Sequence, residues 1–152
     1  MKKILILLQL ILIITITSCG GYKSIYSSKI QNFNIISIET DEYNKINSKV
    51  KNSLKLFSNN NSKNIINVKI NSKKTISITS KNSKGDPKTY SMNINLNLEI
   101  DKNGTKKIKI FNESFEYNTR SNKFDLKKYE RNVQNNLTEK IIENITLYLS
   151  NI

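Results

Sequence analysis

The sequence predicts an α+β domain, a two-layer sandwich in which two helices pack on one face of a four-stranded sheet. In two segments the apolar residues recur every three or four positions, which is the spacing of one stripe on an amphipathic helix. In the other segments they alternate with polar residues or form a short run, which indicates strands. The segments follow one another as β-α-β-β-β-α. Strands that alternate have one solvated face, so both helices belong on the other face.

One such domain, residues 32–152, is predicted to follow a signal peptide and a tether. Lys2 and Lys3 precede an apolar run over residues 4–16, which is shorter than the roughly 20 residues that span a bilayer as a helix. A branched apolar residue and two small ones, Ile16-Thr17-Ser18, then stand before Cys19, as in the lipobox of bacterial lipoproteins. We therefore expect residues 1–18 to be the signal peptide and residues 19–31 to be a lipidated, extended tether.

Cys19, the only cysteine in the chain, is the predicted lipid attachment site. In lipobox proteins this cysteine carries a thioether-linked diacylglycerol and then a fatty acyl chain, such as palmitate, on its amino group. Two or more acyl chains hold a protein stably at a membrane. Gly20, where an acidic residue would retain such a protein at the inner membrane, favours the periplasmic side of the outer membrane of a Gram-negative cell. We expect no cofactor beyond this covalent lipid.

The first predicted elements of the domain are a strand and a helix. The strand covers Phe33–Glu39, and Thr40 or Asp41 then offers a cap for the helix. The helix is expected to end near the polar loop Asn59–Lys63. Its apolar stripe consists of Tyr43, Ile46, Val50, Leu54 and Phe57.

Two long strands are predicted next, with a polar loop over Lys81–Lys88 between them. In the first, the even-numbered residues Ile66, Val68, Ile70, Ile76 and Ile78 fall on one face. In the second, apolar and polar residues alternate strictly from Tyr90 to Ile100. The sequence Ser83-Lys84-Gly85-Asp86-Pro87 supplies the turn that joins them.

A tight hairpin turn at Asn103-Gly104 leads into the fourth strand, because this pair tolerates the positive φ that such a turn requires. The apolar residues of that strand change parity between Ile110 and Phe115, which predicts a bulge near Phe111–Ser114. A long helix closes the chain. Its stripe consists of Leu126, Tyr129, Val133, Leu137, Ile141, Ile145 and Tyr148 or Leu149.

The chain is strongly basic, with 25 Lys and Arg against 12 Asp and Glu and a net charge of +13. Such an excess is typical of nucleic-acid-binding proteins, but export of the chain argues against that partner. The chain has no Ala and places Arg only at positions 120 and 131. This bias indicates AT-rich coding, so part of the positive charge can reflect composition alone.

The sequence contains no catalytic constellation. It has no His, the side chain best suited to general-base chemistry near neutral pH. Glu113 and Glu116 point to opposite faces of a strand, and no metal-ligand cluster or phosphate-binding glycine loop is present. We therefore expect a binding protein without a metal, not an enzyme.

Basic side chains are concentrated in two places. The first is the hairpin between the two long strands, with Lys73, Lys74, Lys81, Lys84 and Lys88. The second follows the fourth strand, with Arg120, Lys123, Lys127 and Lys128. Lysine is a compact point charge that suits phosphate, and arginine binds phosphate as a fork. These groups predict contact with anionic lipid headgroups, and the competing interpretation is a set of solvated loop lysines.

The chain resembles the LPS-assembly lipoproteins of the LptE family, of the alphaproteobacterial type. The motifs that carry the resemblance are Cys19–Tyr26 after the lipobox, Lys84–Pro87 before the strictly alternating strand, and Phe115–Asn118 leading into Asn122–Glu130. The order β-α-β-β-β-α is also that of the family, so the resemblance covers the mature chain. The chain departs from the family in using Lys where many members use Arg and in lacking the polar C-terminal tail of some relatives.

The resemblance implies a plug inside the outer-membrane barrel LptD that helps the barrel to receive lipopolysaccharide. It also implies that basic residues contact lipopolysaccharide, which by position are Lys81, Lys84, Lys88, Arg120 and Lys123. A solvent-exposed, polar sheet face is compatible with the polar lumen of a barrel. Two alternatives stay open: a periplasmic lipoprotein subunit of an ABC-type lipid transporter, and a stand-alone envelope lipoprotein.

Overall fold

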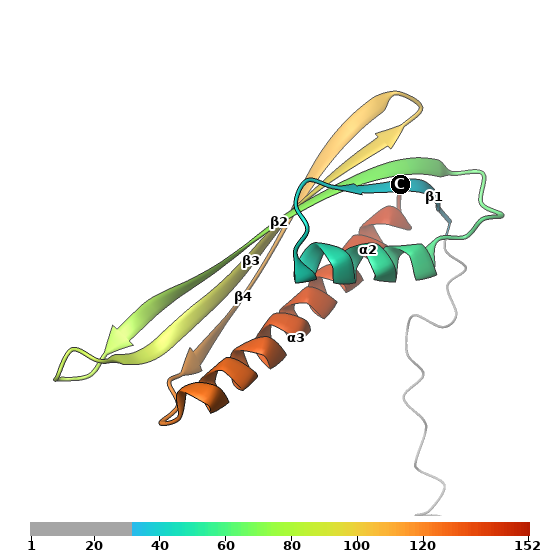
Figure 1. The fold of residues 1–152 in the computed structure, drawn as a ribbon. Coiled ribbons are helices and arrows are strands. Elements are labelled where there is room, and N and C mark those ends of the chain that lie inside the picture. Colours follow the sequence, from blue (N-terminus) through green and yellow to red (C-terminus); the bar gives the residue numbers. More distant parts are fainter. Residues whose placement is uncertain (1–31) are drawn as a thin grey trace, which may run out of the picture. The chain divides into compact units, whose positions relative to one another are not determined.

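The elements of the structure, a computed structural model that describes residues 32–152, follow the predicted order β-α-β-β-β-α. The predicted signal peptide and tether, including Cys19, lie outside the described residues. The elements are β1 (Asn34–Thr40), α2 (Lys45–Phe57), β2 (Ile65–Lys81), β3 (Pro87–Lys102), β4 (Thr105–Asn118) and α3 (Lys123–Leu149) (Figure 1).

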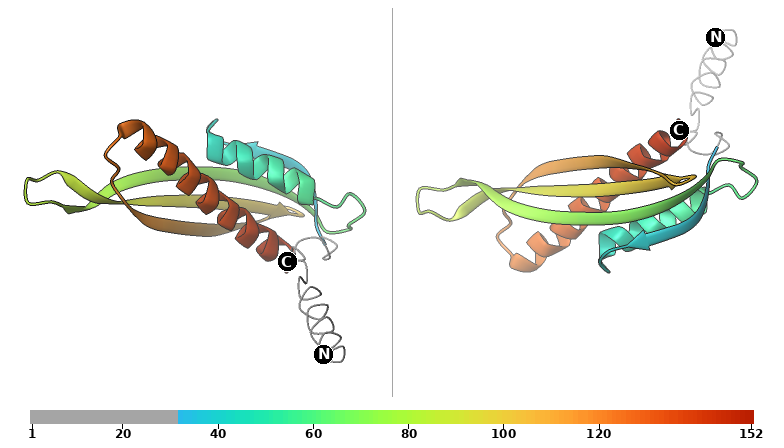
Figure 2. Two further views of the ribbon diagram at one scale, coloured as in Figure 1. Left: turned by 90° about the horizontal axis from the view of Figure 1, so that it is seen from below. Right: turned by 90° about the horizontal axis from the view of Figure 1, so that it is seen from above.

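The four strands form one mixed sheet in the order β1-β2-β3-β4. β1 runs parallel to β2, and the other neighbouring strands are antiparallel. A parallel neighbour requires a crossover, which α2 provides. α2 packs on β1 and β2, whereas α3 packs on β3 and β4, so both helices cover the same face of the sheet (Figure 2). The predicted two-layer α+β sandwich is confirmed.

The core lies between the helices and the helix-facing side of the sheet. On β3, every second residue is buried: Met92, Ile94, Leu96, Leu98 and Ile100. α3 buries its predicted stripe from the third turn to its end, namely Val133, Leu137, Ile141, Ile145 and Leu149. Each such side chain contributes about 1.5–3 kcal/mol when it leaves water. Hydrophobic burial therefore holds both helices on this face.

The predicted hairpin turn between β3 and β4 is present at Asn103-Gly104. Asn103 has φ 54° and Gly104 has φ 80°, the positive values that this type of two-residue turn requires. The carboxylate of Asp101 accepts a hydrogen bond from the backbone N–H of Gly104 at 2.9 Å. Lys102 and Thr105 close the hairpin as a cross-strand pair.

The predicted bulge in β4 is wrong. β3 and β4 stay in one continuous register from Thr89 opposite Asn118 to Lys102 opposite Thr105. The parity change has another cause, because Ile108 and Ile110 point to the open face and are 69% and 58% exposed. Phe111 and Tyr117 point to the helices and are buried. The sheet does contain irregularities, which lie between Ile35 and Ser37 on β1 and between Ile78 and Lys81 on β2.

The first helix begins later than predicted. Asn44, and neither Thr40 nor Asp41, is its N-cap, and the Asn44 side chain accepts from the backbone N–H of Asn47 at 2.8 Å. Tyr43 therefore lies before the helix and is 95% exposed, so its predicted place in the apolar stripe is wrong. Ile46, Val50 and Leu54 are buried as predicted.

β2 and β3 form a hairpin that extends beyond both helices (Figures 1 and 2). The loop between them is shorter than predicted, because β2 reaches Lys81 and β3 begins at Pro87. Cross-strand pairing of Ile78 with Tyr90 persists almost to the tip.

Candidate functional site

The tip of the β2–β3 hairpin carries three of the five predicted lipopolysaccharide-binding residues. Lys81 ends β2 opposite Pro87, Lys84 lies in the loop and Lys88 follows the start of β3, and all three are exposed. Asn82 orders the loop, because its side-chain oxygen accepts from the backbone N–H groups of Lys84 at 3.0 Å and Asp86 at 2.9 Å. The loop thus presents its lysines on an ordered turn.

The other two predicted residues, Arg120 and Lys123, lie where β4 leads into α3. The Arg120 guanidinium lies 4.5 Å from the centroid of the Tyr129 ring, which is a cation–π geometry. Lys123 is the first residue of α3, directly after the N-cap Asn122. A lysine is unfavourable at the positive end of a helix dipole, and Asp125 in the same turn offsets it.

Arg120 contacts the first of three tyrosine rings that pack against one another in turn. The Tyr129 ring meets the Tyr117 ring edge-on at 5.8 Å, and Tyr117 stacks on Tyr90 at 5.7 Å. The Tyr117 hydroxyl donates to Glu130 at 3.0 Å. Burial raises the pKa of the Tyr117 hydroxyl, and the hydrogen bond to Glu130 raises it further. These contacts attach the start of α3 to the sheet and fix the position of Arg120.

The two predicted groups lie at the same end of the domain (Figure 1). The backbone N–H of Thr119 donates to the carbonyl of Lys88 at 2.9 Å, so the segment before α3 lies beside the hairpin. The two groups of predicted residues do not line a common pocket. A hollow of about 360 Å³ beside Arg120 is lined by residues from 120 to 132 alone, including Asp125 and Lys128. The five predicted cations therefore form a broad, exposed edge.

A further group of cations, of which only Lys74 was named from the sequence, lies where α2, β2 and α3 meet. A cavity of about 310 Å³ is lined there by Gln134, Asn135 and Thr138 together with four cationic side chains. We call these four residues the cationic cleft: Lys45, Lys49, Lys74 and Arg131. Lys74 was expected at the hairpin tip, but β2 continues for seven residues beyond it, so Lys74 lies beside α3 instead.

Two members of the cationic cleft have partners and two do not. The Lys49 ammonium pairs with Glu139 at 2.8 Å, and the Lys74 ammonium donates to the Gln134 side chain at 2.7 Å. Within residues 32–152, Lys45 and Arg131 have no hydrogen-bonding or ionic partner. Lys45 and Lys49 are four residues apart, so the sequence alone places them on the same side of a helix. Only the packing of α2 against α3 brings that side to Arg131.

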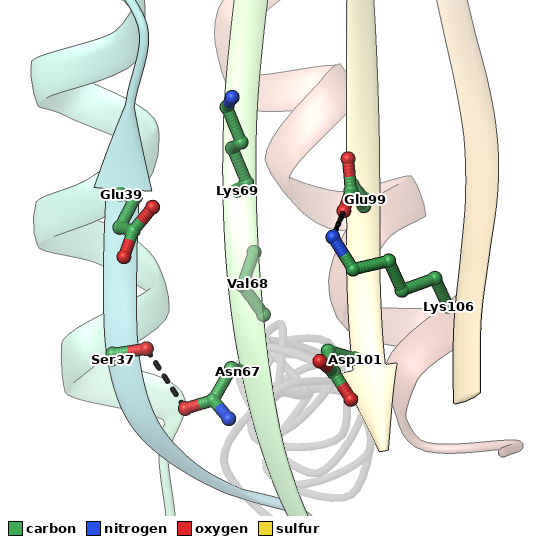
Figure 3. A pocket seen from close by; sticks show the side chains of 8 residues that line it. All are labelled: Ser37, Glu39, Asn67, Val68, Lys69, Glu99, Asp101 and Lys106. Atoms are coloured by element: carbon green, nitrogen blue, oxygen red, sulfur yellow. Dashed lines mark hydrogen bonds and ion pairs between the residues drawn. The ribbon is translucent and has the colours of Figure 1, made fainter. Parts of the chain in front are cut away.

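The open face of the sheet carries a polar hollow of about 410 Å³ between β1 and β4 (Figure 3). Its lining carries charges of both signs, with carboxylates at Glu39, Glu99 and Asp101 and ammonium groups at Lys69 and Lys106. Lys106 pairs with Glu99 at 2.8 Å, and Lys69 pairs with Asp41 at 2.7 Å. These hydrogen-bonded pairs raise the pKa of both lysines. Ser37 donates to Asn67 at 2.8 Å beside them. The hollow thus offers alternating charges and not a field of one sign.

Among residues 32–152, no three His, Cys, Asp or Glu side chains are grouped so as to hold a metal ion. None of the helices in this range combines the length and apolar character needed to cross a membrane.

The sequence itself matches no protein-family profile and no curated protein. The fold matches several solved lipoproteins. Rare lipoprotein B from Shewanella oneidensis has a TM-score of 0.59 at 13% identity and covers 78% of this chain and 98% of its own. An uncharacterized lipoprotein B from Nitrosomonas europaea has a TM-score of 0.59 at 11% identity, covering 83% and 88%. A minor lipoprotein from Acinetobacter baumannii has a TM-score of 0.53 at 12% identity, covering 79% and 96%.

These similarities span nearly the whole of the compared lipoproteins and confirm the expected resemblance at the level of the fold. The described residues have a lipoprotein B-type fold. At sequence identities of 11–13%, the similarity establishes the fold and nothing about function.

Proposed function

We propose that this protein is an outer-membrane lipoprotein that partners and plugs an LptD-type β-barrel and helps it to assemble and transport lipopolysaccharide. The observation that carries the proposal is the lipoprotein B-type fold, shared over almost the full length of the solved lipoproteins. The lipobox at Cys19 supports it independently, because it predicts the same lipid anchor. The role is one of binding, without catalysis and without a metal.

The two faces of the domain suit a plug. The helices fill one face with apolar packing, whereas the open face of β3 presents Asn93, Asn95, Asn97 and Glu99. A barrel lumen is polar, so the amide and carboxylate groups of β3 can hydrogen-bond to it, while Ile108 and Ile110 of β4 add two exposed apolar side chains to the same face. The exposed cationic edge at Lys81, Lys84, Lys88, Arg120 and Lys123 provides phosphate-binding groups for lipopolysaccharide.

A pull-down of the full-length lipoprotein from its own outer membranes tests the proposal. The membranes are extracted with a mild detergent, the protein is captured through a C-terminal tag on a linker, and co-purifying proteins are identified by mass spectrometry. We expect a large β-barrel in about equal amount. An unrelated outer-membrane lipoprotein with the same tag controls for bulk membrane carry-over. Recovery of the protein alone, or with an inner-membrane ATPase complex, contradicts the proposal and favours one of the two alternatives.

A further inference from the structure

The helix-facing side of the sheet continues beyond the helices along the β2–β3 hairpin (Figure 2). Ile76 lies opposite Met92 and Ile78 lies opposite Tyr90, so both isoleucines share the face that is buried elsewhere. Here that face is open, because Ile76 is 39% exposed and Ile78 is 47% exposed. Tyr90 is partly buried beside them. We call Ile76, Ile78 and Tyr90 the apolar strip.

A cation stands at the inner end of the apolar strip. Side chains alternate along the regular part of β2, so Lys74 points to the same face as Ile76. Lys74 also belongs to the cationic cleft, where its ammonium reaches Gln134 of α3 at 2.7 Å. The apolar strip therefore runs directly out of the cationic cleft toward the hairpin tip.

The chemistry of this arrangement fits a phosphorylated amphiphile. The cleft is lined by four cations and by uncharged polar residues, and Lys45 and Arg131 are unpartnered within the described range. Arginine binds phosphate through a planar fork and lysine through a point charge. The apolar strip consists of three side chains on the paired strands β2 and β3, which suits a linear acyl chain. Each methylene that leaves water there favours binding.

We propose that the cationic cleft and the apolar strip form one site, in which the cleft holds a lipid A phosphate of lipopolysaccharide and the strip holds an acyl chain. This inference rests on the proposed function and adds the requirement for an acyl chain. The exposed hairpin lysines alone would bind any polyanion, whereas the strip selects a ligand that is both phosphorylated and acylated. The site therefore begins where α2, β2 and α3 meet and continues along the β2–β3 hairpin to Ile78 and Tyr90.

Photo-crosslinking from the apolar strip tests this site in the full-length lipoprotein. The photoreactive residue p-benzoylphenylalanine replaces Ile78, or Ile110 as the matched control, in cells whose membranes are then irradiated. Ile110 is exposed to a similar degree but lies on the open face. We expect a lipopolysaccharide adduct from position 78 and none from position 110. Adducts with protein or phospholipid only, equal adducts from both positions, or no adduct at position 78 would overturn the proposal.

The purified lipoprotein then separates the roles of the phosphate and of the acyl chain. Crosslinking at position 78 should occur with intact lipopolysaccharide and be lost with its chemically deacylated form. The double substitution Lys45→Glu with Arg131→Glu should lower the adduct yield several-fold. Lys55→Glu with Lys107→Glu, which changes the net charge equally on exposed residues outside the cleft, should leave it unchanged. Equal yields from the two double variants would contradict a phosphate site in the cleft.

A tag pull-down from the same unirradiated membranes keeps the two proposals distinguishable. A co-purified barrel without a position-78 adduct rejects the site and leaves the plug function standing. An adduct without a barrel rejects the plug function and retains a lipopolysaccharide-binding lipoprotein.

Discussion

The hydroxyl of Tyr117 on β4 donates a hydrogen bond to the carboxylate of Glu130 on α3 across 3.0 Å. Tyr117 is buried, and its ring lies between the rings of Tyr90 and Tyr129. The bond therefore connects the end of the sheet to the first turns of α3. It also supports the surface on which Arg120 rests.

Removing only this hydroxyl should weaken the domain measurably. Tyr117→Phe keeps the ring packing and deletes one hydrogen bond to a charged acceptor, so we expect the free energy of unfolding to fall by about 1–2 kcal/mol. Urea denaturation followed by circular dichroism measures the change. Tyr43→Phe is the control, because Tyr43 is 95% exposed. If the two variants were equally stable, the hydrogen bond would have no net effect on stability.

Tyr117 should also give the domain an alkaline limit. Its pKa in the folded protein is raised above the ordinary value of 10.0, because burial and Glu130 disfavour the phenolate. A raised pKa stabilises the fold fully below the unfolded value, and that contribution is lost as the pH rises above it. Stability should therefore decline above about pH 10. Denaturation curves measured across that range should fall less steeply for Tyr117→Phe than for the wild type, and parallel curves would contradict this role.

The straight register of β4 predicts opposite outcomes for two adjacent residues. Phe111 faces the helices and is 8% exposed, whereas Ile110 faces solvent and is 58% exposed. Phe111→Ala should cost about 3–5 kcal/mol because it opens a cavity in the core. Ile110→Ala should change stability by about 0.5 kcal/mol or less. Chemical denaturation of both variants tests this order, and a large cost at Ile110 would restore the bulged arrangement.

The same strand shows where prediction from sequence ends. Periodicity located every element, because burial on one face imposes a two-residue repeat on strands and a 3.6-residue repeat on helices. Periodicity could not place Ile108 and Ile110, because it assumes that apolar residues are buried, and these two lie on the open face. The exposed edge around Lys81, Lys84 and Arg120 followed from local lysine density. The cationic cleft did not, because Lys45 and Arg131 are far apart in sequence and meet only through the packing of α2 against α3.

The turn between β3 and β4 should depend on backbone conformation and not on space. Gly104 has φ 80°, and a Cβ added there would meet no heavy atom within 4 Å. Gly104→Ala should therefore lower the free energy of unfolding by about 1–2 kcal/mol, the approximate cost of a left-handed conformation for an L-residue. Gly104→Asn should cost less, because asparagine tolerates this conformation better. Equal costs for Ala and Asn in thermal or urea denaturation would point to a cause other than φ.

Charge reversal at the hairpin tip should separate lipopolysaccharide binding from barrel association. Lys81 and Lys84 are exposed on a loop ordered by Asn82, so Lys81→Glu with Lys84→Glu should leave the fold intact. We expect weaker binding of lipopolysaccharide, because two phosphate-attracting charges become repulsive, and unchanged recovery of the barrel in a pull-down. Lys55→Glu with Lys107→Glu alters the net charge equally at exposed positions on α2 and β4 and serves as the control. If both variants lost binding alike, the tip lysines would act only through the overall charge. If neither did, they would be solvated side chains that lipopolysaccharide does not contact.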